Sequence, residues 1–404
     1  MKSSNEYTML AKTFKGLEEV LAQELIELGA NDVQMERRAV RFSGDKAVLY
    51  KANLCLRTAS RVLVIIKGER LMVKGDRKKP EDLLYACAKE IDWSQYMSAD
   101  STFAIDATVY SETFRNSRFV TYRVKDAIAD YWTEKTGQRP NVRVTDPDIL
   151  VHVHIAQERL TIGLDSSGES LHKRGYRVAN TEAPINEALA AGMLLIAGWH
   201  GQSDFYDPMC GSGTLPIEAA LIARNIAPGL FRKAFAFEKW RDFDAELWSE
   251  IYNDDSRERP FVHKIYASDA SFYAIQQAAK NVKSAGMDKC IGLKQIRLEE
   301  LKPLSPLTSH HSPLIMMNPP YGERLASNKD IEVLYGKIGT ALKHNWAGAT
   351  AWIISSNEAA MKCVGLKPGK KLRLLNGELD CQFNRYDLFA GKRNEALTGL
   401  MTND

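Results

Sequence analysis

Hydrophobic and polar positions follow two periods along the chain, and their alternation predicts a mixed α/β fold. The run KGLEEVLAQELIELGA (15–30) carries apolar residues every three to four positions, which predicts a helix after the strand-like YTMLAKT (7–13). SRFVTYRVKDAIADYWTEKTG (117–137) predicts a helix closed by Gly137, and ILVHVHIAQERLTIGLDSSG (149–168) predicts a two-stranded ribbon. Small strands and helices therefore alternate up to about residue 170.

The pattern changes near residue 170. A polar basic loop leads into a long apolar helix, and Pro184 is expected in its first turn, where a proline costs least. Short apolar strands then alternate with helices of one to two dozen residues, which is typical of a parallel sheet with helices on both faces. LRLLNGELDCQFNRYDLF (372–389) predicts a closing antiparallel hairpin. We therefore expect a doubly wound domain in the second half.

Composition limits the class of protein. The chain has 404 residues, enough for two or three domains, with 45% apolar and 26% charged residues. It contains no apolar run of the roughly 20 residues that a bilayer crossing needs, and its N-terminus lacks the apolar core of a secretory signal. Six scattered cysteines without a CxxC pair fit reduced thiols. We expect a cytoplasmic protein with no membrane segment.

Basic residues gather locally, although the net charge is only +3. Between Arg57 and Lys79 there are eight Lys and Arg against two acids. This density predicts a face that contacts nucleic-acid phosphates, and the alternative is an ordinary solvated surface. Together with the basic loop near residue 175, the residues expected to bind nucleic acid are Arg57, Arg61, Arg77, Lys78, Lys79, Arg174 and Arg177.

The stretch FYDPMCGSGTLPIEAALIA (205–223) predicts a strand, a glycine-rich turn and a helix. Gly211 and Gly213 permit a tight bend and the close approach of a ligand. Because Leu215 and Pro216 follow, the pyrophosphate fingerprint GxGxxG is absent, and a nucleoside with a charged amino-acid tail is favoured. The next strand, KIYASD, ends in Asp269, which can accept both ribose hydroxyls. The alternative is a purely structural turn.

In the stretch LIMMNPPYGERL (314–325), a predicted apolar strand is followed by Asn318 and two consecutive prolines. The amide oxygen of Asn318 and the carbonyl of Pro319, stiffened by two fixed φ angles, can accept hydrogen bonds from an exocyclic amine. Tyr321 offers a face on which a base can stack. Because ligands bind at the carboxyl ends of neighbouring strands, Asp207 and Asn318 are expected at one crevice. The alternative is a simple loop start.

DPMCGSGTLPIEAA together with NPPYGERL resembles the S-adenosylmethionine (SAM)-dependent guanine-N2 RNA methyltransferases of the bacterial RlmL type, which act on large-subunit rRNA. GLEEVLAQEL, SRVLVIIKGER, HKRGYRVANTEAPINEALAAGML and PGLFRKAFAFEKW are also similar to that family. The resemblance implies a ferredoxin-like element (1–50), a THUMP RNA-binding domain (51–170) and a Rossmann-like class I methyltransferase domain (171–404). This last domain should hold a mostly parallel seven-stranded sheet and an insertion at about 225–262.

The resemblance also implies the site. The catalytic residues it implies are Asn318, Pro319, Pro320 and Tyr321. The residues it implies for SAM are Pro184, Asn186, Asp207, Pro208, Met209, Cys210, Gly211, Ser212, Gly213, Thr214, Asp269, Ala270, Arg297 and Leu298. One position departs: Arg297 and Leu298 stand where the family usually carries an Asp beside the adenine amine. Either Glu299 replaces that acid, or the contact is made by the backbone.

The leading hypothesis is a methyltransferase acting on a guanine N2 amine of 23S rRNA. Alternatives are a tRNA guanine-N2 enzyme, an adenine-N6 methylase of nucleic acid, and a non-catalytic RNA-binding factor in ribosome assembly. No metal is expected, because His152 and His154 have no third ligand at a known spacing. Glu218 is either a contact of the cofactor amine or an ordinary helix acid. The chain ends soon after residue 389, and we expect a single catalytic domain.

Overall fold

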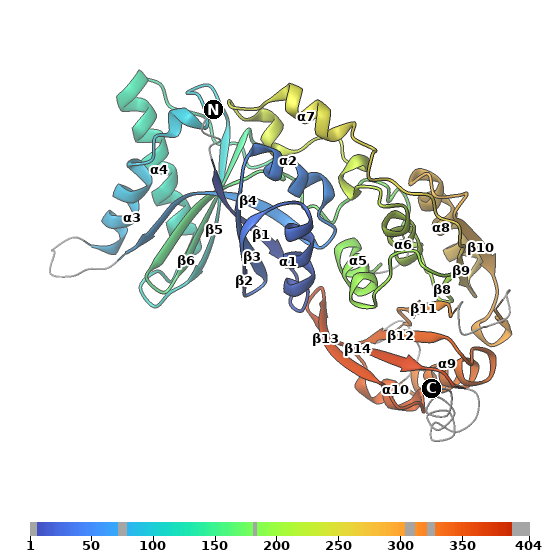
Figure 1. Cartoon of the computed structure of the whole chain (residues 1–404). Helices are drawn as coiled ribbons and strands as arrows, with labels where there is room; N and C mark the ends of the chain where they lie inside the picture. The colour runs from blue at the N-terminus through green and yellow to red at the C-terminus, as the bar shows by residue number, and fades with distance from the viewer. Residues whose placement is uncertain (1–5, 72–78, 181–183, 304–311, 321–327, 390–404) are drawn as a thin grey trace, which may run out of the picture. The chain divides into compact units, whose positions relative to one another are not determined.

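The structure is a computed structural model that describes residues 6–71, 79–180, 184–303, 312–320 and 328–389 (Figure 1). The described chain divides into two compact units. The first contains residues 1–13, 21–171 and 232–254, and the second contains 14–20, 172–231 and 255–404. Within the described residues, we find no helix with both the length and the apolar character that a bilayer crossing requires.

The first unit is built on strands from the first 165 residues. Its strands are β1 (Tyr7–Thr13), β2 (Asn31–Glu36), β3 (Ala39–Gly44), β4 (Ala59–Arg70), β5 (Phe103–Tyr110), β6 (Ile149–Ala156) and β7 (Arg159–Asp165). The helices of this part of the chain are α1 (Glu18–Glu27), α2 (Lys46–Cys55), α3 (Pro80–Lys89), η1 (Trp93–Gln95) and α4 (Ser117–Thr136). The ribbon predicted at 149–168 is confirmed as β6 and β7, and the helix predicted at 117–137 ends at Gly137 in the left-handed conformation.

One continuous sheet runs through the first unit. In the described residues its order is β2-β3-β1-β4-β7-β6-β5. Strand β4 is antiparallel to β1 on one side and to β7 on the other, so it joins the N-terminal strands to the later ones. The two small α/β patterns predicted from the sequence thus share a single hydrogen-bonded sheet.

Part of the predicted insertion belongs to this first unit. The insertion contains η2 (Pro228–Phe231), η3 (Ala236–Lys239) and α7 (Ala245–Tyr252), and residues 232–254 cluster with the N-terminal strands. The buried Tyr50 of α2 stacks on Phe237 with ring centroids 4.4 Å apart and meets the edge of Trp248 at 5.7 Å. The aromatic residues of the insertion therefore serve as core for this unit.

The second unit holds a doubly wound sheet. Its strands are β8 (Phe205–Asp207), β9 (Ile265–Asp269), β10 (Ile291–Gln295), β11 (Leu314–Met317), β12 (Thr350–Ser355), β13 (Lys370–Asn376) and β14 (Leu379–Asp387). Its remaining helices are α5 (Glu187–Ile196), α6 (Thr214–Arg224), α8 (Phe272–Ser284), η4 (Leu298–Glu300), α9 (Asn328–Asn345) and α10 (Glu358–Cys363). The described strands are ordered β10-β9-β8-β11-β12-β14-β13.

Strands β8 to β12 are parallel, and β14 is antiparallel to both β12 and β13. The predicted parallel sheet and closing hairpin are confirmed. Alternate residues of β11 enter two cores: Met316 packs with α5 and α6, and Ile315 packs with α9. Burial on both faces explains why LIMM is apolar throughout. Pro184 was expected in the first turn of α5, but that helix begins at Glu187 with Asn186 as its cap, so the prediction is wrong and Pro184 precedes the helix.

Candidate active site

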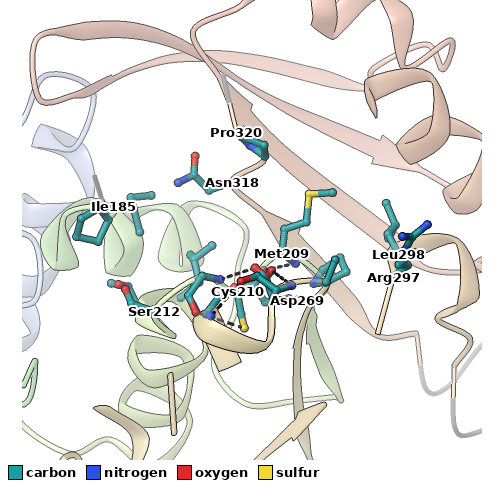
Figure 2. A pocket seen from close by; sticks show the side chains of 18 of the residues that line it. Ile185, Met209, Cys210, Ser212, Asp269, Arg297, Leu298, Asn318 and Pro320 are labelled. Carbon is teal, nitrogen blue, oxygen red and sulfur yellow. Dashed lines mark hydrogen bonds between the residues drawn. The ribbon is translucent and has the colours of Figure 1, made fainter. Parts of the chain in front are cut away.

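A pocket of about 760 Å³ opens at the carboxyl ends of β8, β9, β10 and β11. This volume lies within the range of ligand sites of roughly 300–1,000 Å³. Its position is where the order of a doubly wound sheet reverses, between β8 and β11. Figure 2 shows Ile185 at one end of the pocket, Arg297 and Leu298 at the other, and Asp269 between them.

The loop between β8 and α6 forms the floor of this pocket. Its turn is closed by a hydrogen bond from the Gly213 amide to the Cys210 carbonyl at 2.8 Å. Gly213 has φ of 86°, and a Cβ there would lie 3.3 Å from the side chain of Ala278 on α8. A side chain at this position would be both strained and crowded. The predicted cofactor-loop residues that line the pocket are Asp207, Pro208, Met209, Cys210, Gly211, Ser212 and Thr214.

Asp269 accepts hydrogen bonds from two backbone amides, one of that loop and one of its own segment. Its Oδ2 accepts from the Gly211 amide at 3.1 Å, and its Oδ1 accepts from the Ser271 amide at 2.8 Å. Each carboxylate oxygen keeps a second lone pair, so the group can still accept hydroxyl hydrogens from a ligand. Ala270, which follows in the chain, also lines the pocket.

Asp207 is buried at the end of β8 with 1% of its surface exposed. Burial raises the pKa of its carboxyl well above the usual range; the Met209 amide at 3.2 Å opposes the shift, and the charge of Asp269 adds to it. A cation close to this carboxyl would favour its ionised form. The pocket therefore favours a positively charged ligand.

Asn318 and Pro320 bring β11 to the same pocket. The Oδ1 atom of Asn318 is buried, and no described residue donates a hydrogen bond to it. A buried acceptor of this kind costs about 1–3 kcal/mol unless a ligand satisfies it. Pro319 is buried and does not line the pocket. Tyr321 lies outside the described residues, so its predicted stacking role stays a prediction.

The end of the pocket beside β10 holds Arg297, Leu298 and Glu299. Glu299 pairs with Lys337 of α9 at 3.4 Å, and both side chains line the pocket. A backbone hydrogen bond and the Lys337 ammonium hold the pKa of Glu299 below its usual range, while burial opposes them. A carboxylate is thus present near the position where the expected Asp is missing.

The segment before α5 forms another wall. Pro184 and Ile185 line the pocket, but Asn186 does not. The Oδ1 atom of Asn186 accepts from the amides of Ala188 and Leu189, so this residue caps the helix. The pocket lining does not support its predicted approach to the cofactor, which stays a prediction. Sequence reasoning missed other lining residues, because they come from helices whose faces it did not assign or from the segments just before them: Ile185, Leu215, Ser271, Tyr273, Ala274, Leu334 and Lys337.

The two arginines of the basic loop lie inside the second unit. Arg174 is 1% exposed, and its Nε lies 3.4 Å from Oε1 of Glu218, which also accepts from the Tyr176 hydroxyl at 2.9 Å. Glu218 is buried outside the pocket lining, which favours an ordinary helix acid over a contact of the cofactor amine. Arg177 donates to Thr214 and Glu187 instead of facing solvent. These positions do not support the predicted role of Arg174 and Arg177 in binding nucleic acid.

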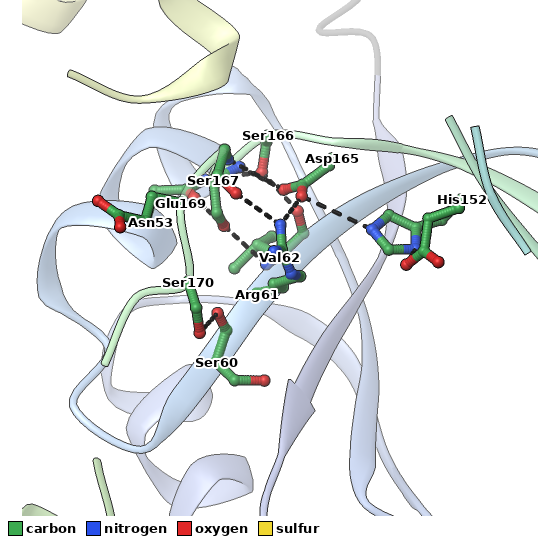
Figure 3. A network of polar contacts seen from close by, with 12 residues as sticks. Asn53, Ser60, Arg61, Val62, His152, Asp165, Ser166, Ser167, Glu169 and Ser170 are labelled. Carbon is green, nitrogen blue, oxygen red and sulfur yellow. Dashed lines mark hydrogen bonds and ion pairs between the residues drawn. The ribbon is translucent and has the colours of Figure 1, made fainter. Parts of the chain in front are cut away.

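The predicted basic face of the first unit is also partly internal. Arg61 forms an ion pair with the buried Asp165, whose Oδ2 lies 3.6 Å from Nε2 of His152 (Figure 3). Burial opposes ionisation of Asp165, but His152 and Arg61 hold its pKa below the usual range. Arg57 is buried with 7% exposure. Lys79 is exposed at the start of α3, whereas Arg77 and Lys78 lie outside the described residues.

A sheet of this order, with a glycine-rich loop after its first strand and an acid ending its second, defines a class I methyltransferase. Three family models match the chain: an RlmL ferredoxin-like domain over residues 8–63, a THUMP domain over 78–165, and an RMKL-like methyltransferase domain over 174–385. The chain belongs to the RMKL-like methyltransferase family. The resemblance inferred from the two motifs and the predicted fold class are thereby confirmed.

Similar proteins agree with this assignment. Protein slr0064 of Synechocystis sp., named as a candidate RNA methyltransferase, is 36% identical over 94% of this chain and 96% of its own. The ribosomal RNA large subunit methyltransferase K/L of Aliivibrio fischeri is 37% identical over 96% of this chain and 55% of its own. The chain thus spans about half the length of that relative. The structure of SMU.472, a candidate methyltransferase complexed with SAH, superposes with a TM-score of 0.84 at 28% identity, covering 96% of this chain and 99% of that one.

SAM is the cofactor of this family, and the pocket fits it. SAM carries a positive sulfonium and an ammonium group, which suit a site with two acids, Asp207 and Asp269. The free lone pairs of Asp269 suit ribose hydroxyls, and Ile185, Pro208 and Leu298 offer apolar contact. The left-handed conformation of Gly213 lets the loop turn tightly, and its neighbours Ser212 and Thr214 line the pocket. The predicted cofactor is confirmed, and the roles of the individual residues stay predictions.

Proposed function

We propose that this protein methylates RNA, transferring a methyl group to the exocyclic N2 amine of a guanine in 23S rRNA. The observation that carries the proposal is the buried Oδ1 of Asn318, an acceptor unsatisfied by any described residue, at the rim of a pocket that suits a cationic cofactor. The THUMP match and the relatives named for the large ribosomal subunit support an RNA substrate.

The chain's own residues would position the amine. Asn318 Oδ1 accepts one amine hydrogen, and the Pro319 carbonyl, with the φ angles of both prolines fixed, accepts the other. These two hydrogen bonds turn the nitrogen lone pair out of conjugation with the ring and toward the cofactor. SAM, when bound, supplies an electrophilic methyl group. Catalysis then rests on orientation and electrostatics, without a covalent nucleophile.

The target base must be unpaired or leave its helix to reach this site, and Tyr321 would stack on it. The same two acceptors suit the N6 amine of adenine, which keeps an adenine-N6 methylase as an alternative. A tRNA guanine is a second alternative, and a non-catalytic assembly factor is a third. The pocket with Asp207, Asp269 and Asn318 favours an enzyme over the last of these.

The test is nucleoside mass spectrometry of separated 23S rRNA and tRNA from cells with the gene, without it, and complemented by Asn318→Ala. We expect 23S rRNA from cells without the gene to lack one N2-methylguanosine. The wild-type gene should restore this nucleoside, and the Asn318→Ala gene should not. The same loss in tRNA, or loss of N6-methyladenosine, would select the corresponding alternative. Unchanged nucleosides in all fractions would support the non-catalytic factor and overturn the proposal.

A further inference from the structure

Arg177 lies between two walls of the cofactor pocket. On one side its Nε donates to Glu187 Oε1 at 2.7 Å, and its Nη2 donates to the Ile185 carbonyl at 3.1 Å. On the other side Nη2 donates to Thr214 Oγ1 at 3.0 Å, and Nη1 lies 3.4 Å from Ser212 Oγ. One guanidinium thus binds the segment before α5 and the glycine-rich loop together.

The environment makes this contact strong. The side chain of Arg177 is 15% exposed and that of Glu187 is 7% exposed, so water competes weakly for these hydrogen bonds. Ser212 and Thr214 flank Gly213, the residue in the left-handed conformation, so the guanidinium contacts both sides of the turn. A lysine could not reproduce a planar fork with several fixed donors.

Asn281 of α8 holds the same turn from a second side. Its Nδ2 donates to the carbonyls of Ser212 at 2.9 Å and Ala179 at 2.8 Å. Its Oδ1 accepts from the amides of Val178 and Ala179, both at 2.9 Å. Asn281 is buried, with 1% of its surface exposed. Asn281 therefore joins the residues after Arg177 to the loop by hydrogen bonds of its own.

We propose that Arg177, supported by Asn281, is a positioning residue for SAM. It holds Ile185 and the Ser212–Thr214 turn at the separation that forms the pocket, and it does not contact the nucleic acid. The loop carries the Gly211 amide that donates to Asp269, so a shift of the turn would also disturb the acid expected to bind ribose. The inference rests on the cofactor assignment and holds whichever nucleic acid is methylated.

The test compares full-length wild type, Arg177→Ala, Arg177→Lys and Arg224→Ala by calorimetry with SAM, thermal unfolding, steady-state kinetics and RNA binding. Arg224 is the matched control, because it forms an ion pair on the same domain, with Glu258 at 3.4 Å, away from the pocket. We expect Arg177→Ala to raise the Kd and KM for SAM about tenfold, as loss of charge-assisted hydrogen bonds predicts. The Kd and KM of Arg177→Lys for SAM should lie between those of Arg177→Ala and wild type.

RNA affinity and its salt dependence should be unchanged in every variant. A folded Arg177→Ala or Arg177→Lys protein with SAM affinity within twofold of wild type would overturn the inference. Weakened RNA binding with normal SAM affinity would restore the sequence-based role of Arg177. If Arg177→Ala does not fold, the lysine variant decides. Wild type that binds no SAM would instead refute the cofactor assignment, and this inference with it.

Discussion

The carboxylate of Asp269 accepts a hydrogen bond from the Gly211 amide at 3.1 Å. This contact ties the end of β9 to the loop that follows β8, so two neighbouring strand ends form one ligand-binding surface. The acid is thereby oriented before a ligand arrives, which lowers the entropic cost of binding.

Replacing Asp269 should weaken SAM binding. Asp269→Ala removes an acceptor that is expected to bind two ribose hydroxyls, and hydrogen bonds to a charged group are worth about 1.5–3 kcal/mol each. We expect the Kd for SAM to rise at least tenfold by calorimetry, and Asp269→Asn to be intermediate. Unchanged affinity in Asp269→Ala would refute the ribose-binding role.

Replacing Asn318 should separate chemistry from cofactor binding. Asn318→Ala removes the acceptor that orients the amine, and losing one such polar group in an active site costs about 10²–10³ in rate. Methyl transfer from labelled SAM to RNA should fall by that factor, while calorimetry shows SAM affinity within about threefold of wild type. Normal turnover in this variant would remove Asn318 from the catalytic residues.

Because of Asp207, we expect the stability of the ligand-free protein to depend on pH. Since burial raises the pKa of Asp207, the folded state binds a proton more tightly than the unfolded state does. Asp207 therefore contributes fully to stability below the pKa of an Asp in the unfolded chain, which is about 3.9. This contribution is lost as pH rises through the higher pKa that Asp207 has in the folded protein. Asp207→Asn should unfold at a higher temperature than wild type at pH 7.

The difference in thermal midpoint between Asp207→Asn and wild type should shrink as pH falls toward 4. Thermal unfolding measured across the pH range checks this. SAM should bind the variant more weakly, since one of the two acids near its positive charge is removed. The same difference in thermal midpoint at all pH values would show that Asp207 has the same pKa in the folded and unfolded chains.

Glu218 should matter for stability and not for the cofactor. Glu218→Ala removes the carboxylate that neutralises the buried Arg174, and breaking a buried pair in this way costs about 3–5 kcal/mol. Denaturant unfolding should show this loss, while Arg224→Ala, in the more exposed pair, should change stability by less than about 1 kcal/mol. A folded Glu218→Ala protein should bind SAM normally. A selective loss of SAM affinity would contradict its place outside the pocket.

The remaining basic candidates of the first unit should bind RNA. Charge reversal at Arg77, Lys78 and Lys79 should weaken RNA binding and make its dependence on salt shallower, by about 0.7–0.9 in log–log slope for each phosphate that is no longer neutralised. Reversal of Arg37 and Arg38, exposed at the β2–β3 turn, is the control and reproduces about two thirds of the change in net charge. If filter binding shows equal affinity and slope in both variants, the 77–79 stretch is a solvated surface.

The sequence predicted the features that follow from local pattern and parallel topology. The apolar runs located β8, β9 and β11, and the rule for neighbouring strand ends brought Asp207 and Asn318 to one pocket. It could not predict the partner of Arg177, because an arginine in a polar loop has the same pattern whether it faces solvent or Glu187. Lys337 was missed for a related reason: its pocket contact depends on how α9 is rotated against the sheet.

The packing of Tyr50 against Phe237 has a consequence for synthesis of the protein on the ribosome. The first unit cannot complete its core when residue 171 emerges, because its missing aromatic layer is encoded about 60 to 80 positions later. The nascent chain must keep Tyr50 uncovered until residue 254 has left the exit tunnel. A fragment that stops at residue 171 would keep that surface exposed permanently, whereas the intact chain exposes it only during translation.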